Sequence, residues 1–130
     1  MFVDTSAWYA AYVANDPHHA SVKRLLAVAA SRLTTTDQVL AESLTLLRAR
    51  GEYARAVLLG RDLLAGEIAQ VIQPTPDDLQ KAFVIFSTYA DKAWSFVDCT
   101  SFVVMQRINT SDALSLDAHF RQMPGIAVYP

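Results

Sequence analysis

The chain has 130 residues, of which 52% are hydrophobic and 18% are charged. That length fits one domain, since domains average about 150 residues, and the composition excludes intrinsic disorder. Eleven Lys and Arg against thirteen Asp and Glu give a net charge of −2, so no overall positive field attracts nucleic acid. The single cysteine, Cys99, excludes an internal disulfide and a cysteine-rich zinc site.

The sequence shows no sign of a membrane or export segment. No stretch approaches the roughly 18 consecutive apolar residues of a membrane span. The N-terminus, MFVDTSAW, lacks the basic start, apolar run and small-residue cleavage site of a signal peptide. Together with the single cysteine, which suits a reducing compartment, this predicts a cytoplasmic protein.

The first half of the chain predicts strands that alternate with helices. Residues 1–3 form a short apolar run that stops at Asp4, as a buried strand would. Two helices end at glycines, Gly51 and Gly66, which are favoured just past a helix. The expected elements are a helix over 5–13, a helix that opens at Asp16-Pro17, a short strand over 32–35, and helices over 37–50 and 52–65.

The second half continues the alternation. Thr75-Pro76-Asp77-Asp78 is a strong helix start, because it combines a capping hydroxyl, a proline in the first turn and two carboxylates at the positive helix end. The expected elements are a strand over 68–73, a helix from 75 to about 92, a loop or extended piece over 94–97, a helix over 98–109, and strands over 113–116 and 126–129.

This order of elements predicts an α/β fold: one domain over residues 1–130, an α/β/α sandwich with a central, mostly parallel sheet of about five strands. In such sheets the ligand site lies beyond the carboxyl ends of the strands, where the strand order reverses. The first and fourth expected strands end at Asp4 and Asp117. The functional site is therefore expected at that edge.

Four carboxylates stand out at or near that edge: Asp4, Glu42, Asp98 and Asp117. Each has an ordinary explanation, since an aspartate before a helix is commonly an N-cap and one after a strand can form a turn. Glu42 lies on a largely apolar helix face, so it needs a cation, either an arginine such as Arg48 or Arg50 or a metal ion. Carboxylates with no accompanying His or Cys suit a hard ion, Mg²⁺ or Mn²⁺, rather than zinc, and such an ion can promote hydrolysis of a phosphodiester.

The sequence resembles the PIN-domain ribonucleases, and among them the VapC-type toxins of bacterial toxin–antitoxin pairs. The matching pieces, in order, are MFVDTSAWYA, TTTDQVLAE, WSFVDCTSFVVMQ, ALSLDAHF and IAVYP. The resemblance implies an Mg²⁺- or Mn²⁺-dependent endoribonuclease whose acidic quartet is Asp4, Glu42, Asp98 and Asp117. It implies that Asp4, Asp98 and Asp117 hold the ion. It also implies an RNA substrate, a small antitoxin partner and a homodimer.

Residues beside the quartet have two interpretations each. Ser6, Thr100 and Ser101 could hydrogen-bond a metal-binding carboxylate, although helix capping is the simpler role for the last two. His119 is expected to be structural rather than a general base. Asp112 lies outside the matched motif and is expected to form a turn or cap.

Two further expectations remain open. The alternative function is a non-catalytic RNA-binding or scaffold module on the same fold. Metal-dependent cleavage of RNA would favour the nuclease over this alternative. Trp8, Tyr9 and Tyr12 are candidates either for an apolar contact surface or for the core.

Overall fold

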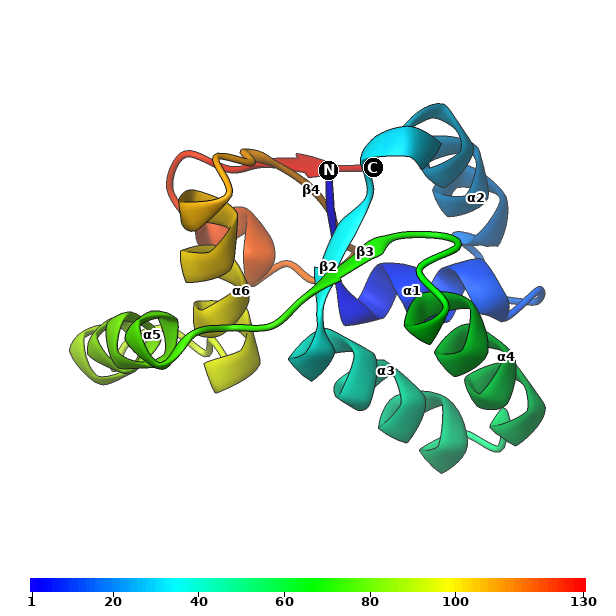
Figure 1. The fold of residues 1–130 in the computed structure, drawn as a ribbon, viewed down its shortest axis with the longest axis horizontal. Coiled ribbons are helices and arrows are strands. Elements are labelled where there is room, and N and C mark those ends of the chain that lie inside the picture. Colours follow the sequence, from blue (N-terminus) through cyan, green and yellow to red (C-terminus); the bar gives the residue numbers. More distant parts are fainter.

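A computed structural model describes residues 1–130 and shows a five-stranded sheet between two groups of helices (Figure 1). The strands are β1 (Phe2–Val3), β2 (Thr34–Thr36), β3 (Gln70–Ile72), β4 (Asp112–Leu114) and β5 (Ala127–Tyr129). They lie in the order β3-β2-β1-β4-β5, and every neighbouring pair is parallel. The predicted α/β class with a sheet of about five strands is confirmed.

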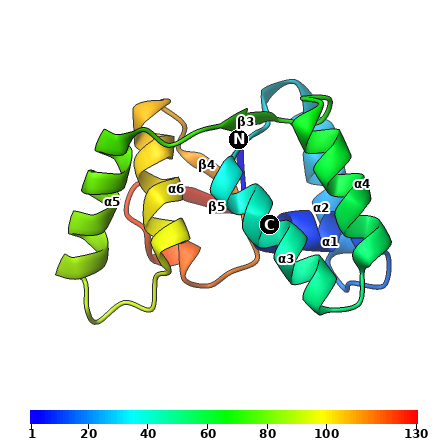
Figure 2. The same cartoon turned by 60° about the horizontal axis from the view of Figure 1, so that its bottom comes forward.

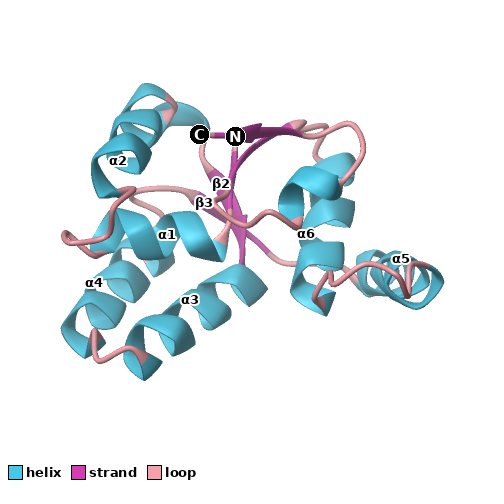
Figure 3. Ribbon diagram, turned by 180° about the vertical axis from the view of Figure 1, so that it is seen from behind, coloured by secondary structure: helices cyan, strands magenta, loops and turns pink.

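The helices divide into two layers. They are α1 (Thr5–Tyr12), α2 (His19–Val28), α3 (Asp37–Ala49), α4 (Tyr53–Leu64), α5 (Pro76–Thr88) and α6 (Phe96–Arg107), with short 3-10 turns at Ala30–Arg32 and Phe120–Gln122. Figure 2 shows α1 to α4 on one side of the sheet and α5 and α6 on the other, and the view from behind in Figure 3 shows the same division. None of these helices is long and apolar enough to cross a bilayer.

The strand order reverses at β1. From β1 the chain crosses through α1 and α2 to β2, and then through α3 and α4 to β3. It returns through α5 and α6 to β4, on the other side of β1, where Val3 pairs with Leu114. Crossovers between parallel strands are right-handed. The crossover from β3 to β4 runs across the sheet in the opposite direction to the earlier ones, so its helices α5 and α6 lie on the opposite face. A crevice therefore opens between β1 and β4 at their carboxyl ends.

The main core lies between the sheet and the first helical layer. Phe2 and Trp8 are fully buried, and the ring of Phe2 stacks on that of Phe120 with 6.2 Å between centroids. The indole Nε1 of Trp8 donates to Thr35 Oγ1 at 3.3 Å. Burial of side chains this large stabilises the fold by roughly 2–3 kcal/mol each. Trp8 is thus a core residue and not part of a contact surface, whereas Tyr9 and Tyr12 are half-buried.

Two predicted helix boundaries in this region are wrong. The second helix was expected to open at Asp16-Pro17, but α2 begins at His19. The Asp16 carboxylate instead accepts the backbone N–H of His18 at 2.8 Å. This hydrogen bond forms a turn immediately before α2. The helix after Thr75 was expected to reach about residue 92, but α5 ends at Thr88.

The boundaries around two of the candidate acids also differ from the prediction. Helix α6 begins at Phe96 with Ser95 as its N-cap, so Asp98 lies inside the first turn and does not begin the helix. Strand β4 ends at Leu114, three residues before Asp117, so that aspartate belongs to a loop. Asp112, expected in a turn or cap, is the first residue of β4.

One buried carboxylate links the start of helix α5 to α6, beside the apolar cluster that Ala82 forms with Cys99 and Val103. The Asp78 side chain accepts the backbone N–H of Thr75 at 2.9 Å and completes a capping box. It also accepts Nε of Arg107, on α6, at 2.9 Å. Burial alone would raise the pKa of Asp78, but the hydrogen bonds from Thr75 and Arg107 outweigh it and leave this pKa below its ordinary value.

We expect Asp78→Ala to lower the free energy of unfolding by about 2–3 kcal/mol, because it removes a cap and leaves Arg107 without its partner. Urea denaturation at neutral pH measures this change. The control is Asp77→Ala, which removes an exposed pair with Lys81 and an exposed charge at the helix start, and should cost less than about 1 kcal/mol. Equal effects of the two substitutions would contradict the assignment.

Candidate active site

A cleft of about 330 Å³ opens at the carboxyl ends of the strands, at the edge where the site was expected. It brings together all four predicted acids, from four separate parts of the chain. Its walls are formed by Asp4, Thr5, Ser6, Glu42, Leu46, Ala93, Ser95, Asp98, Asp117 and His119. The acids come from the end of β1, the middle of α3, the first turn of α6 and the loop after β4.

Asp4 lies deepest and is only 5% exposed. It is the N-cap of α1, so the capping role and a place in the cleft coexist. Its Oδ2 accepts the hydroxyl of Ser6 at 2.9 Å and that of Ser115 at 2.9 Å. Burial raises the pKa of Asp4 above its ordinary value, although these hydrogen bonds act in the opposite direction.

Glu42 is half-buried on α3 and faces the cleft. Its Oε2 accepts a short hydrogen bond from the hydroxyl of Thr5, the residue after Asp4. The expected arginine partners lie elsewhere: the Arg48 guanidinium lies over the ring of Tyr53 and that of Arg50 over the ring of Tyr9. Glu42 is therefore held by a neutral donor and keeps its charge uncompensated.

Asp98 lies in the first turn of α6 and is 8% exposed. Its Oδ2 accepts the backbone N–H of Ser95 at 2.8 Å, and the Ser95 hydroxyl accepts the N–H of Asp98 at 3.0 Å. Burial raises the pKa of Asp98 to about 6, and the negative charges of Asp4 and Asp117 contribute to the increase. Asp98 is thus close enough to Asp4 and to Asp117 to be repelled by both.

Asp117 lies at the rim, on the loop between β4 and β5. Its Oδ1 accepts the backbone N–H of His119 at 2.8 Å, and Nδ1 of the His119 ring lies 3.3 Å from the same oxygen. His119 therefore forms part of the cleft wall. The structure places its ring against the Asp117 carboxylate, and the expectation that His119 is structural rather than a general base stays a prediction.

One feature is common to the four acids: the hydrogen bonds fall on one carboxylate oxygen of each. These oxygens are Oδ2 of Asp4, Oε2 of Glu42, Oδ2 of Asp98 and Oδ1 of Asp117. The second oxygen of each receives none of these bonds, and none of these second oxygens is a buried atom without a partner. The carboxylates are each oriented through one oxygen, and the second oxygen is free of these hydrogen bonds.

The chemistry of this donor set fits a hard divalent cation. The cleft offers carboxylate oxygens, no cysteine, and no Lys or Arg side chain in its lining. A cation would also relieve the repulsion that raises the pKa of Asp98. As they stand, no three His, Cys, Asp or Glu side chains converge closely enough to form a complete metal site. Oxygen ligands from water and from a phosphate would complete such a site.

The structure also identifies residues that the sequence analysis missed: Thr5 and Ser115, whose hydroxyls donate to Glu42 and Asp4, and Ser95, whose backbone N–H donates to Asp98. The pair Ser95 and Asp98, three apart, is a capping-box pattern that could have been recognised. Ser115 has no such local signal, because its partner Asp4 is 111 residues away along the chain.

Of the three hydroxyl residues singled out from the sequence, only Ser6 bonds a quartet acid. Thr100 does not cap α6 and instead donates to the backbone oxygen of Phe96 at 2.8 Å. Ser101 is fully buried, and its hydroxyl has no partner. The capping role considered for Thr100 and Ser101 is therefore wrong.

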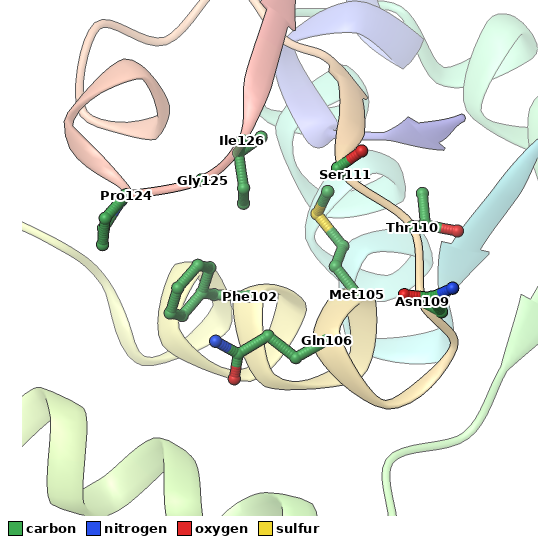
Figure 4. A pocket seen from close by; sticks show the side chains of 9 residues that line it. All are labelled: Phe102, Met105, Gln106, Asn109, Thr110, Ser111, Pro124, Gly125 and Ile126. Atoms are coloured by element: carbon green, nitrogen blue, oxygen red, sulfur yellow. The ribbon is translucent and has the colours of Figure 1, made fainter.

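A second cavity, of about 370 Å³, lies at the amino ends of β4 and β5 (Figure 4). Its lining combines side chains from α6 with the two segments that lead into these strands. The lining residues are Phe102, Met105, Gln106, Asn109, Thr110, Ser111, Pro124, Gly125 and Ile126. None of them is charged, so this cavity cannot hold a cation through carboxylates.

The family model described as PIN domain matches residues 1–126. The chain is 32% identical over 130 residues to the 23S rRNA-specific endonuclease VapC20 of Mycobacterium tuberculosis, a match that covers 100% of this chain and 98% of that protein. It is 29% identical over 121 residues to the ribonuclease VapC26 of the same organism, covering 92% and 89% of the two chains.

Comparison with solved structures gives the same family and fold. The crystal structure of M. tuberculosis VapC20, described as a sarcin-ricin loop cleaving toxin, matches with a TM-score of 0.86 at 33% identity, over 92% of both chains. PAE2754 of Pyrobaculum aerophilum matches with a TM-score of 0.69 at 16% identity, over 98% of this chain and 88% of that one, which supports the fold alone. From the family match, the full-length identity and the shared fold, the chain belongs to the PIN domain family, among its VapC-type members.

Proposed function

We propose that this protein is an Mg²⁺- or Mn²⁺-dependent endoribonuclease and the toxin of a toxin–antitoxin pair. The observation that carries the proposal is the arrangement of four carboxylates, each with one oriented and one available oxygen, in a cleft at the reversal of strand order. The relatives named as ribonucleases support RNA as the substrate class. The relative named as a 23S rRNA-specific endonuclease makes the sarcin-ricin loop the first RNA to test.

Each acid has a role that follows from its position. Asp4, Asp98 and Asp117 would hold the cation, because the negative charges of Asp4 and Asp117 act on Asp98. Glu42 lies on the facing wall, fixed by Thr5, and would orient the attacking water with its second oxygen. A bound divalent ion supplies an activated water and neutralises charge on the scissile phosphate. In-line attack would leave a 5′-phosphate and a 3′-hydroxyl, as the family resemblance implies.

The proposal includes two protein partners. A small antitoxin would hold the enzyme inactive by covering the acidic cleft, and a second copy of the chain would form a homodimer. The structural match to a toxin-antitoxin complex from Klebsiella pneumoniae has a TM-score of 0.70 at 11% identity, so it supports the shared fold. The VapC names of the relatives support the toxin role.

The first test is cleavage of a panel of structured RNAs, including the sarcin-ricin loop, with Mg²⁺, with Mn²⁺ and with chelator. Asp4→Asn and Asp98→Asn should each lower the cleavage rate by about a hundredfold or more, since each removes a charged cation ligand. Gel analysis of end-labelled RNA measures this rate.

The matched control is Asp112→Asn, an exposed aspartate at the amino end of β4, outside the cleft. Its cleavage rate should equal that of the wild type. RNA binding without cleavage under every metal condition would favour the non-catalytic RNA-binding module instead.

The electrostatics of Asp98 predict a pH-dependent stability of the metal-free protein. Its folded-state pKa of about 6 lies above the ordinary value of 3.8, so the folded state binds the proton more tightly. Stability from this group is therefore present below about pH 4 and is lost as the pH rises through 6. The unfolding free energy of Asp98→Asn minus that of the wild type should therefore increase by roughly 2 kcal/mol from pH 4.5 to pH 7.5.

Urea denaturation in chelator at the two pH values measures this difference. Addition of Mn²⁺ at pH 7.5 should then stabilise the wild type and have little effect on Asp98→Asn, because the ion binds the folded carboxylates. An unchanged difference between wild type and variant across this pH range would refute the assigned electrostatics of Asp98.

A further inference from the structure

The loop that contains Asp117 is attached to the sheet in an unusual way. Strand β4 ends at Leu114, and the N–H of Ser115 still bonds to β5 through the oxygen of Tyr129 at 2.9 Å. The next two amides bond to side chains. The N–H of Leu116 donates to Ser6 Oγ at 2.9 Å, and that of Asp117 donates to Ser115 Oγ at 3.1 Å.

The two serine hydroxyls have the same pattern of hydrogen bonds. Each donates to Oδ2 of Asp4, at 2.9 Å in both cases. Each accepts one of the two loop amides, Ser6 that of Leu116 and Ser115 that of Asp117. The two hydroxyl oxygens also lie 3.3 Å apart, but only that of Ser115 accepts the amide of Asp117 and so connects it directly to the carboxylate of Asp4.

The hydrogen bond between Ser115 and Asp4 is shielded from water. Ser115 and Asp4 are both buried, so water cannot easily replace the hydroxyl as a donor to Oδ2. Asp117 lies at the exposed rim, where its side chain has only His119 as a local partner. The position of Asp117 relative to Asp4 is thus determined mainly by the buried serine between them.

We infer that Ser115 is a positioning residue, which sets the distance and orientation of Asp117 relative to Asp4 and so prepares the two carboxylates for one cation. The inference rests on the proposed function for the role of the cation. The hydrogen-bonded connection itself is independent of that function.

The connection is tested first in the metal-free protein, by NMR measurement of amide hydrogen exchange. Ser115→Ala should accelerate exchange at Asp117 by about tenfold and at Leu116 by less than about threefold. Ser6→Ala should give the opposite pattern, because its hydroxyl holds the amide of Leu116. Unchanged exchange at Asp117 in a cooperatively folded Ser115→Ala variant would overturn the inference.

The consequence for the cation is tested by calorimetric titration with Mn²⁺. Ser115→Ala should weaken Mn²⁺ affinity by about tenfold, as loss of a supporting hydrogen bond commonly does, and Ser115→Thr, which keeps the hydroxyl, should retain most of it. The matched control is Ser43→Ala, a fully buried serine on α3 whose hydroxyl donates to Val39 and touches none of the four acids.

Cleavage kinetics separate positioning from general damage. In Ser115→Ala, kcat should fall at saturating Mn²⁺ while KM for RNA stays near the wild-type value. Mn²⁺ affinity equal to that of the wild type would overturn the inference. A wild type that binds no Mn²⁺ would overturn the proposed function instead, and the exchange pattern would still decide whether Ser115 holds Asp117.

Discussion

The structure depends on one unfavourable condition: two buried carboxylates, Asp4 and Asp98, lie where the strand order reverses, and the charges of Asp4 and Asp117 act on Asp98. Desolvating a carboxylate costs several kcal/mol unless other groups compensate. Part of the compensation comes from helix ends, since Asp4 caps α1 and Asp98 lies in the first turn of α6. Both carboxylates therefore face the positive end of a helix dipole.

The rest of the compensation comes from neutral donors. The hydroxyls of Thr5, Ser6 and Ser115 and the backbone N–H of Ser95 bond the acids of the cleft. No Lys or Arg forms an ion pair with any of the four, although the chain has eleven such residues. An arginine would satisfy the carboxylates more completely, but it would occupy the cleft and remove the attraction for a cation. Neutral donors fix the geometry and leave the negative charge available.

The sequence was sufficient for the parts of this arrangement that depend on local pattern. Alternating strands and helices predicted the parallel sheet, and the position of Asp4 after an apolar run predicted the edge where the acids meet. Element ends were less predictable, because they depend on contacts in space. The backbone after Leu114 leaves the strand where Ser6 and Ser115 take its amides, so Asp117 lies on a loop and not at a strand end. The bond from Leu116 has no signal in the neighbouring sequence, because Ser6 lies 110 residues away, whereas the bond from Asp117 to Ser115 is a local serine turn.

Asp78 and Asp98 show why local sequence alone cannot identify a functional acid. Both occupy the third position of a helix, both complete a capping box with a hydroxyl residue three positions earlier, and both are buried. Their electrostatics are opposite, because hydrogen bonds from Thr75 and Arg107 together hold the pKa of Asp78 below its ordinary value, whereas burial and two neighbouring acids raise that of Asp98 to about 6. The first is neutralised by the protein and stabilises it. The second has no cationic side chain beside it, and only the residues brought to each acid by the fold distinguish the two.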